Sequence, residues 1–469
     1  MTDALTRLRQ LQAADLPVHG GRTLAYVYDS GLPDVDRVGR EAVAAYAGSN
    51  GLDPTAFPSL LQMENELVGY ALDLLHGPDT AVGTVTSGGT ESVLLAVQTA
   101  RDAAAVERPR MVIPSTAHAA FHKAGHYFGV EPVVVPVRED FRVDPAAMAA
   151  AVDDHTVLVV ASAPSYAHGV IDPVAEIAAI ARQRGVRCHV DACIGGWVLP
   201  FKARLGREVP PWTFAVEGVT SISVDTHKYG YAPKGTSLLL HRTPALRRPQ
   251  LFASAAWPGY TMLNSTMQST KSGGPLAGAW AVMRTLGDDG YLDLTEQVLA
   301  AVDDLVAAIE AQPALRLVAR PDSTLIALTT DESLDVFTLV DELGLRGWYV
   351  QPQLSHADQP ATVHLSVSAA TRPHVPAFAA ALAESVAAAQ AAGPVAVDPG
   401  VAELVRSLDA TALTDEEFDG LLAFAGLAGG SSLVPDRMAP VNALLDLASS
   451  ATREAVLIAF LDRLSRPVR

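Results

Sequence analysis

The sequence predicts an α/β fold with a mostly parallel β-sheet, followed by a smaller α+β domain. Short β-branched runs alternate with Ala- and Leu-rich helical patterns along much of the chain, which is typical of strand–helix units. The chain has 469 residues, of which 49% are hydrophobic, so it can bury a large core. Its only cysteines, Cys188 and Cys193, lie in one short segment, which excludes a disulfide framework or a four-ligand zinc site.

Six β-branched or apolar runs predict the strands of the large sheet. Helical or turn patterns separate them, as expected when helices cover both faces of a parallel sheet. In chain order the runs are residues 108–115, 131–137, 155–163, 185–192, 220–225 and 236–242.

The pattern changes near Gly290 and predicts the second domain. A long helical pattern, a strand, a short helix and a second strand follow in turn, at residues 291–312, 323–330, 336–343 and 362–368. A helical tail follows residue 396, in which the acidic run 414–417 begins with a typical helix cap, Thr414. We therefore divide the chain into an N-terminal segment (1–60), a large α/β domain (61–290) and a C-terminal α+β domain with a helical tail (291–469).

The charge and the apolar pattern exclude several classes of partner. There are 34 Lys and Arg residues against 52 Asp and Glu residues, a net charge of −18, which argues against a nucleic-acid or anionic-membrane surface. We see no apolar run that approaches the roughly 18 to 20 residues of a membrane span, and the N-terminus mixes charged and apolar residues. We expect a soluble, cytoplasmic protein without a transmembrane segment.

Lysine is scarce, and one lysine stands in a turn-rich segment directly after a predicted strand. The five lysines are Lys123, Lys202, Lys228, Lys234 and Lys271. Arginine cannot replace an amine that must lose a proton and attack a carbonyl, so amine chemistry would have to retain a lysine. Lys228 follows the run 220–225, where active-site groups of parallel α/β folds lie, although taken alone it also fits an exposed loop residue.

Two further features share one chemical requirement with Lys228. Ser87-Gly88-Gly89-Thr90 precedes a helical pattern and could hold a phosphate on backbone N–H groups, and Asp191 ends a predicted strand. Each alone also fits an ordinary turn or cap. Pyridoxal phosphate needs all three groups: a lysine for its aldehyde, an anion cradle for its phosphate and a carboxylate for its ring nitrogen.

At this point the motifs resemble a known family. GTVTSGGTES, TAHAAFHKA, HGVIDP, HVDACIGG and DTHKYGYAPKG are similar to segments of the sphingosine-1-phosphate lyases. These enzymes belong to the group II pyridoxal-phosphate decarboxylases, which have the aspartate-aminotransferase fold, fold type I. The resemblance runs from about Tyr28 to the end and is weakest before Tyr28 and between residues 396 and 434. It implies a large sheet of the seven-stranded type, mostly parallel, and a small α+β domain.

The resemblance implies a role for each cofactor residue. Lys228 would be the Schiff-base lysine, Asp191 the partner of the pyridine nitrogen, and His118 the residue that stacks on the ring and handles protons. Cys193 would pack against the opposite ring face. The cofactor-binding set is completed by Ser87, Gly88, Gly89, Thr90 and His227, with Thr270 reaching across from a second subunit. A site shared in this way implies a homodimer.

The resemblance also implies a substrate site for a small amine, with or without a phosphate group. Lys234 and Tyr28, or Tyr26 with a shifted alignment, match residues that hold the substrate phosphate. Asp53 stands where the family usually has a histidine, and a carboxylate repels a phosphate unless a cation intervenes.

Three functions remain open at this point. The first is a carbon–carbon lyase that cleaves a 2-amino-3-hydroxy compound to an aldehyde and an amine such as phosphoethanolamine. The second is an amino-acid α-decarboxylase, because the same cofactor permits both reactions. The third is an inactive cofactor-binding paralogue, which the presence of Lys228, Asp191 and His118 disfavours.

Three histidines also allow a competing interpretation, a metal site. His118, His122 and His126 would align at i, i+4 and i+8 on a helix, but no acidic or cysteine ligand lies nearby in sequence. We therefore expect no metal.

Overall fold

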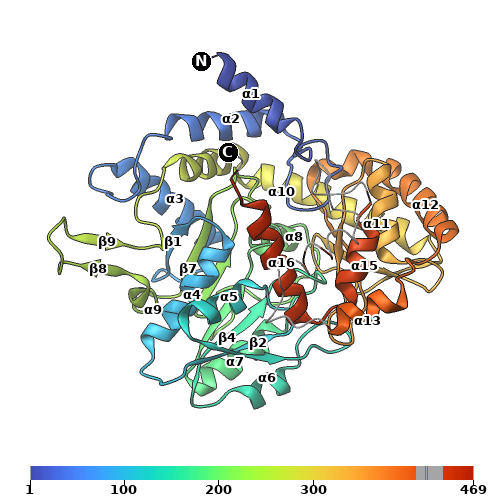
Figure 1. The fold of residues 1–469 in the computed structure, drawn as a ribbon. Helices are drawn as coiled ribbons and strands as arrows, with labels where there is room; N and C mark the ends of the chain where they lie inside the picture. The colour runs from blue at the N-terminus through green and yellow to red at the C-terminus, as the bar shows by residue number, and fades with distance from the viewer. Residues whose placement is uncertain (1, 408–417, 419, 421–436, 468–469) are drawn as a thin grey trace. The chain divides into compact units, whose positions relative to one another are not determined.

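The computed structural model describes residues 2–407, 418, 420 and 437–467 (Figure 1). The chain divides into two compact units. The first comprises residues 1–304, 319–326 and 366–373, and the second comprises residues 305–318, 327–365 and 374–469. The predicted boundaries at residues 60 and 290 stay predictions.

The first unit contains a seven-stranded sheet in the order β1-β7-β6-β5-β4-β2-β3. Strands β2 to β6 run parallel to one another, whereas β7 is antiparallel to both β1 and β6. The strands are β1 (Val82–Thr86), β2 (Arg110–Pro114), β3 (Glu131–Val135), β4 (Thr156–Ser162), β5 (Arg187–Asp191), β6 (Ser221–Val224) and β7 (Ser237–His241). The predicted α/β fold with a mostly parallel sheet is confirmed.

Helices connect the parallel strands, as crossover connections require. They are α4 (Gly89–Ala103), α5 (Ala120–Phe128), α6 (Pro145–Ala151), α7 (Val174–Arg184) and α8 (Leu199–Arg204). Helix α7 contacts β4 and β5, and α4 contacts β7 and β6. Their apolar faces are buried, with Ile177 of α7 and Val97 of α4 inaccessible to solvent or nearly so.

The register of three neighbouring strands brings polar residues to one edge of the sheet. Ser162 at the end of β4 pairs with Asp191 at the end of β5, and Asp191 pairs with Ser223 of β6. The carboxyl ends of parallel strands form the ligand-binding edge of an α/β sheet. This edge therefore positions the candidate site.

Other elements of the first unit were not anticipated from the sequence. The N-terminal region forms α1 (Thr2–Gln12), α2 (Pro33–Ala45) and α3 (Pro58–Leu74), the last two with proline in the first turn. Helix α9 (Pro244–Arg247) precedes a two-stranded hairpin of β8 (Phe252–Ser254) and β9 (Met262–Asn264), visible in Figure 1 as a separate arm. The predicted helix 291–312 is the second part of α10 (Gly274–Glu310), whose first part was not predicted and which is interrupted at Gly287, where φ is 56° and left-handed.

The second unit holds most of a four-stranded sheet in the order β10-β11-β13-β12. Its strands are β10 (Leu315–Leu317), β11 (Leu325–Thr330), β12 (Gln351–Gln353) and β13 (Thr362–Ser366). Its helices include α11 (Val336–Leu345), α12 (Val375–Ala392), α13 (Pro399–Ser407), α15 (Ala439–Leu447) and α16 (Ser450–Leu464). Asp341 of α11 accepts hydrogen bonds from the N–H groups of Met438 and Ala439, both at 2.9 Å, and so caps α15. The predicted cap at Thr414 lies outside the described residues.

One segment, Ala369–Ala392, is long and apolar enough to cross a membrane by length and composition. In the structure it contains α12, whose Phe378, Leu382 and Ala389 are buried. A buried core helix has the same composition, so the segment by itself is weak support for a membrane span.

Candidate active site

A cavity of approximately 390 Å³ lies at the carboxyl edge of the main sheet, within the first unit. Nine of the sequence-predicted residues line it: Ser87, Gly88, Gly89, Thr90, His118, Asp191, Cys193, His227 and Lys228. They come from segments as far apart as residues 87 and 228, so the fold assembles them. The remaining lining residues are Glu91, Val93, Ser162, Pro164, Tyr166, Ile194 and Asp225.

Lys228 follows β6 and forms a buried ion pair with Asp225. Its Nζ lies 2.9 Å from Oδ2 of Asp225. Burial alone would lower the pKa of Lys228, but the Asp225 carboxylate reverses this effect and raises the pKa above its ordinary value. Burial would likewise raise the pKa of Asp225, yet the Lys228 ammonium lowers it. The pair is therefore ionised in the cofactor-free protein.

Asp191 is held by its neighbours in the loop and on the next strand. Its Oδ1 accepts a hydrogen bond from the Cys193 N–H at 3.1 Å and one from the Ser223 hydroxyl at 3.4 Å. The side chain is buried, with 8% of the residue exposed, and faces the cavity. A carboxylate fixed in this way can hold the proton of a pyridine nitrogen.

The N-terminus of α4 lines the same cavity through Ser87, Gly88, Gly89 and Thr90. Gly88 is its N-cap and makes no side-chain cap bond. The first N–H groups of a helix have no intrahelical acceptor and attract anions. The Ser87 N–H donates to Glu91 at 2.6 Å, which fixes the entry into the helix. This turn can bind a phosphate group through backbone donors.

His118 and Tyr166 both line the cavity and their rings contact each other. Nδ1 of His118 accepts a hydrogen bond from the Ala120 N–H at 3.1 Å, so the neutral ring carries its proton on Nε2. The Tyr166 ring meets it edge-on, with centroids 6.3 Å apart. Burial raises the pKa of Tyr166 to about 12, so this residue is a neutral hydroxyl donor.

His227 and Cys193 are neutral groups in the cavity wall. Nδ1 of His227 donates to the Thr236 carbonyl oxygen at 2.6 Å, so Nε2 of the neutral ring is an acceptor, and it would donate to a phosphate only when the ring is protonated. Burial lowers the pKa of His227. Burial and the nearby Asp191 raise the pKa of Cys193, so its thiol stays protonated and packs as a small apolar group.

Tyr28 and Lys234 lie together, as expected for a shared binding role. Nζ of Lys234 lies 4.8 Å from the centre of the Tyr28 ring and donates to the His227 carbonyl oxygen at 3.3 Å. Burial by the surrounding protein and the charge of Lys228 lower the pKa of Lys234 to about 8. The alternative residue, Tyr26, is exposed and has a left-handed φ of 63°.

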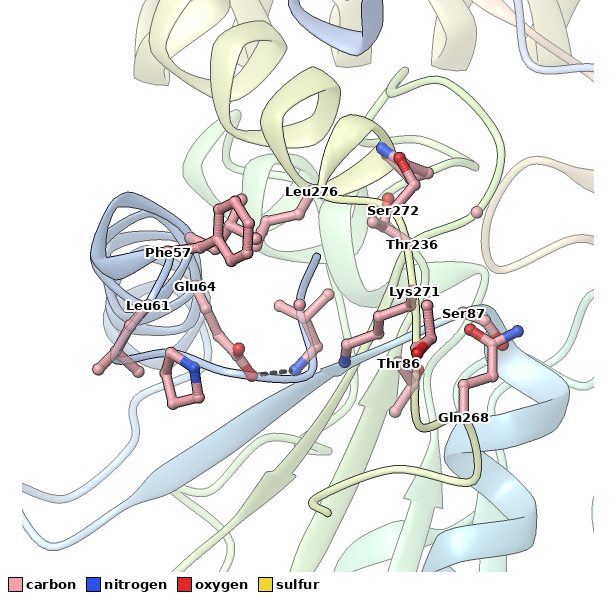
Figure 2. Close-up of a pocket in the computed structure, with 18 of the residues that line it drawn as sticks. Phe57, Leu61, Glu64, Thr86, Ser87, Thr236, Gln268, Lys271, Ser272 and Leu276 are labelled. Atoms are coloured by element: carbon pink, nitrogen blue, oxygen red, sulfur yellow. Dashed lines mark hydrogen bonds between the residues drawn. The ribbon is translucent and has the colours of Figure 1, made fainter. Parts of the chain in front are cut away.

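Asp53 and Thr270 line a second cavity, also of approximately 390 Å³, which meets the first at Ser87. Figure 2 shows Leu61 and Glu64 on one side of it and Thr86 and Lys271 on the other. Asp53 is turned back onto its own loop, because its Oδ1 accepts hydrogen bonds from the N–H and hydroxyl of Thr55 at 2.8 and 2.6 Å. The structure therefore does not bring Asp53 to Tyr28 or Lys234 within one chain.

The three aligned histidines do not share a helix. Helix α5 begins at Ala120, so His118 lies before it, while His122 and His126 lie on it. Within the described residues, His19, Asp29 and Asp36 form a group whose atoms could meet a metal ion, but His19 already bridges both carboxylates at 3.5 Å.

Two residues of this site were missed in the sequence. Asp225 stands three residues before Lys228 and directly follows β6, the strand next to the one that Asp191 ends, so the rule applied to Asp191 also applies to Asp225. Tyr166 follows the end of β4 in a loop, where an aromatic residue gives no specific signal. The roles of the individual site residues stay predictions.

Two family models match parts of the chain. A family model described as the pyridoxal-dependent decarboxylase conserved domain matches residues 30–330. A second model, described as the C-terminal putative HTH domain of pyridoxal-dependent enzymes, matches residues 399–463, which the structure describes only in part.

Three relatives illustrate the similarity. The sphingosine-1-phosphate lyase of Arabidopsis thaliana is 38% identical over 365 residues, 76% of this chain and 66% of that protein. A probable L-aspartate decarboxylase of Pyrococcus furiosus is 29% identical over 74% of this chain and 91% of its own length. The solved structure of a Burkholderia pseudomallei sphingosine-1-phosphate lyase superposes with a TM-score of 0.78 at 36% identity, covering 83% of this chain and 91% of that one.

The chain spans 62–66% of the length of the plant, Dictyostelium and rat sphingosine-1-phosphate lyases that it matches.

The residues present fit the cofactor of this family. Lys228 offers an amine, Asp191 a fixed carboxylate and α4 an anion-binding N-terminus, all around one cavity. Gly89 is needed there, because a Cβ would lie 2.8 Å from both oxygens of Asp225. The chain belongs to the group II pyridoxal-dependent decarboxylase family, and its cofactor is pyridoxal phosphate.

Proposed function

We propose that the protein is a carbon–carbon lyase that cleaves a 2-amino-3-hydroxy compound resembling sphingosine 1-phosphate. The products would be an aldehyde and an amine such as phosphoethanolamine. The observation that carries the proposal is Lys234 beside Tyr28, a cation on the segment that begins with Lys228. A substrate phosphate needs such a cation, and the lyases at 33–38% identity support the assignment.

The chemistry is divided between the cofactor and the side chains. Pyridoxal phosphate, when bound, supplies an aldehyde that bonds to an amine and a ring that accepts the electron pair of the broken bond. Lys228 would bind the aldehyde, Asp191 would keep the ring nitrogen protonated, and the α4 N-terminus with His227 would hold the phosphate. In the reaction, the substrate hydroxyl gives its proton to a base and becomes the aldehyde, while the amine-bearing carbon takes up a proton.

His118 is suited to move these protons. Because Nδ1 accepts from the Ala120 N–H, the neutral ring carries its proton on Nε2, and Nε2 would accept the substrate proton only in the tautomer in which Nδ1 carries the proton instead. Tyr166, beside it, would orient the substrate hydroxyl through its own O–H group.

The second candidate is an amino-acid α-decarboxylase. It is favoured by Asp53, which stands where the lyases usually have a histidine, and by the similarity to the probable L-aspartate decarboxylase. An inactive paralogue is the third candidate, and the retention of Lys228, Asp191 and His118 around one cavity argues against it.

We also propose that the protein acts as a homodimer in the cytoplasm. Thr270 lines the second cavity rather than the cofactor cavity of its own chain, which supports a role toward a partner's cofactor. The hairpin arm exposes Phe252, Trp257, Tyr260 and Leu263, an apolar surface suited to an interface. Both cysteines are free thiols, as expected in a reducing compartment.

Product analysis tests the proposed reaction. The cofactor-loaded protein is incubated with sphinganine 1-phosphate and the products are identified by mass spectrometry, with Lys228→Ala as the control. The proposal predicts a long-chain aldehyde and phosphoethanolamine that are absent with Lys228→Ala. Absence of both products from a protein with normal cofactor absorbance would refute it, and carbon dioxide release from amino acids would then favour the decarboxylase.

A further inference from the structure

Asp225 is the carboxylate in direct contact with the amine of Lys228. It follows β6, only 1% of it is exposed, and its Oδ2 lies 2.9 Å from Nζ of Lys228 and 3.7 Å from Nε2 of His227. Its other oxygen, Oδ1, has no hydrogen-bond partner among the described residues. A buried carboxylate without full hydrogen bonding is costly unless a positive charge stays beside it.

Gly89 brings Asp225 against the first turn of α4. A Cβ at Gly89 would lie 2.8 Å from both carboxylate oxygens and from Sγ of Cys193. The same turn is the predicted cradle of the cofactor phosphate, so two anionic groups are expected close together. Like charges in a buried site repel strongly, and a cation between them removes the repulsion.

Among the groups around Lys228, Asp225 is the one with a negative charge. Tyr28 comes from the N-terminal segment and Cys193 from the loop after β5, and burial raises the pKa of both, so both are neutral. His227 and Lys234 come from the segment of Lys228 itself and carry no negative charge. In the described part of the chain, no other carboxylate lies within salt-bridge distance of Nζ.

We propose that Asp225 is a positioning residue that keeps a positive charge on the Lys228 nitrogen, both when this nitrogen is a free ammonium and when it is bonded to the cofactor. The inference rests on the cofactor assignment in the proposed function and not on the substrate. It gives Asp225 two effects. It fixes the direction of the lysine side chain, and it balances the cofactor phosphate with a neutral Asp225–Lys228 pair.

The test is the pH at which the bound cofactor changes its absorbance, which reports the proton on the lysine nitrogen. Asp225→Asn keeps the shape and removes the charge. We expect this variant to titrate at least about one pH unit lower than the natural protein, because a contacting opposite charge shifts a pKa by roughly one to three units. A merely structural role would leave the titration unchanged, and that result overturns the proposal.

Asp172→Asn is the matched control. Asp172 is also a buried carboxylate of the first unit, and it accepts hydrogen bonds from the Ser162 and Val143 N–H groups but does not contact Lys228. This variant should titrate as the natural protein does. An equal shift in both variants would show a general effect of removing buried charge and would also overturn the proposal.

The natural protein provides a second measurement if Asp225→Asn fails to fold. The absorbance of the protonated form should persist through neutral pH into the alkaline range, and a transition near neutrality would contradict the proposal. Loss of the absorbance in Lys228→Ala verifies that the cofactor is bonded to Lys228. Because no substrate is used, a protein that titrates as expected but releases no aldehyde refutes only the proposed reaction.

Discussion

His189 and Asp191 are joined through one hydroxyl group, that of Ser223. Nε2 of His189 lies 3.2 Å from Ser223 Oγ, and Ser223 donates to Asp191 Oδ1 at 3.4 Å. Since an ionised carboxylate only accepts, Ser223 accepts from the Nε2–H of His189. Nδ1 of His189 then accepts from the Ser221 hydroxyl at 2.9 Å. The carboxylate predicted to meet the cofactor ring is thus fixed by a neutral imidazole inside the sheet.

Removing the Ser223 hydroxyl should weaken the hold on Asp191. For Ser223→Ala we expect the Kd for pyridoxal phosphate to rise about five- to tenfold, the effect of one hydrogen bond to a charged group. Ser221→Ala is the matched control, because it removes the hydroxyl at the other nitrogen of His189 and does not touch Asp191. Equal Kd values in the two variants would contradict the role of the Ser223 hydroxyl in holding Asp191.

Acid should destabilise the protein through buried histidines. Burial lowers the pKa of His189 and His168 from 6.5 to about 4. The unfolded chain therefore takes up protons at a pH where the folded chain does not. The two neutral histidines contribute to the free energy of unfolding above pH 6.5, and this contribution is lost as the pH falls toward 4. Each residue contributes about 3 kcal/mol to this change.

Urea unfolding at several pH values measures this loss. His168 stacks on Phe141 and its Nδ1 has no partner among the described residues, so His168→Gln should flatten the pH dependence at little structural cost. His122→Gln changes an exposed histidine and should leave the slope unchanged. A His168→Gln variant with the natural slope would exclude this residue as a source of the acid sensitivity.

Lys234 should make binding of a phosphorylated substrate dependent on pH. Its pKa of about 8 means that the ammonium loses its proton above that pH, so KM for sphinganine 1-phosphate should rise there. Lys234→Met should raise KM about tenfold at pH 7 and abolish this rise. Lys123→Met removes a surface lysine that contacts Tyr127 and serves as the control. If KM in the natural protein did not change with pH, this would contradict a role of Lys234 in binding the substrate.

Asp53→Asn tests whether charge at this position disfavours phosphorylated substrates. An asparagine oxygen can still accept the hydrogen bonds from Thr55, so the loop should keep its shape. Because the Asp53 carboxylate is turned onto Thr55 and not toward Tyr28 or Lys234, we expect kcat/KM to stay unchanged for sphinganine 1-phosphate and for unphosphorylated sphinganine, and a rise for the phosphorylated substrate alone would place the Asp53 charge at the substrate. An equal change for both substrates would show a structural effect only.

The sequence predicted the large sheet and most of the site for a physical reason. Six β-branched runs became β2 to β7, because buried strands need apolar residues on both faces. It did not predict β1, whose residues Val82–Thr86 merge with the glycine turn that follows. Nor did it predict that β7 runs antiparallel, because periodicity carries no information on strand direction.

Side-chain orientation limits what the sequence could predict of the site. Lys228, Asp191 and the α4 turn could be predicted because the cofactor needs these chemical groups and because they lie at the ends of predicted strands. Asp53 shows the limit, since its identity predicted a charge at the substrate, whereas its carboxylate is turned toward Thr55. The partnership of Asp225 with Lys228 depends on Gly89 leaving room, a three-dimensional fact that no local pattern carries.

The measurement that tests the central claim most directly is identification of the lysine that binds the cofactor. Pyridoxal phosphate is added, the product is reduced with borohydride to make the link permanent, and peptides are mapped by mass spectrometry. With only five lysines in the chain, the result is unambiguous. The account predicts the label on Lys228 alone and no label in Lys228→Ala. A label on Lys123, Lys202, Lys234 or Lys271 in place of Lys228 would contradict it.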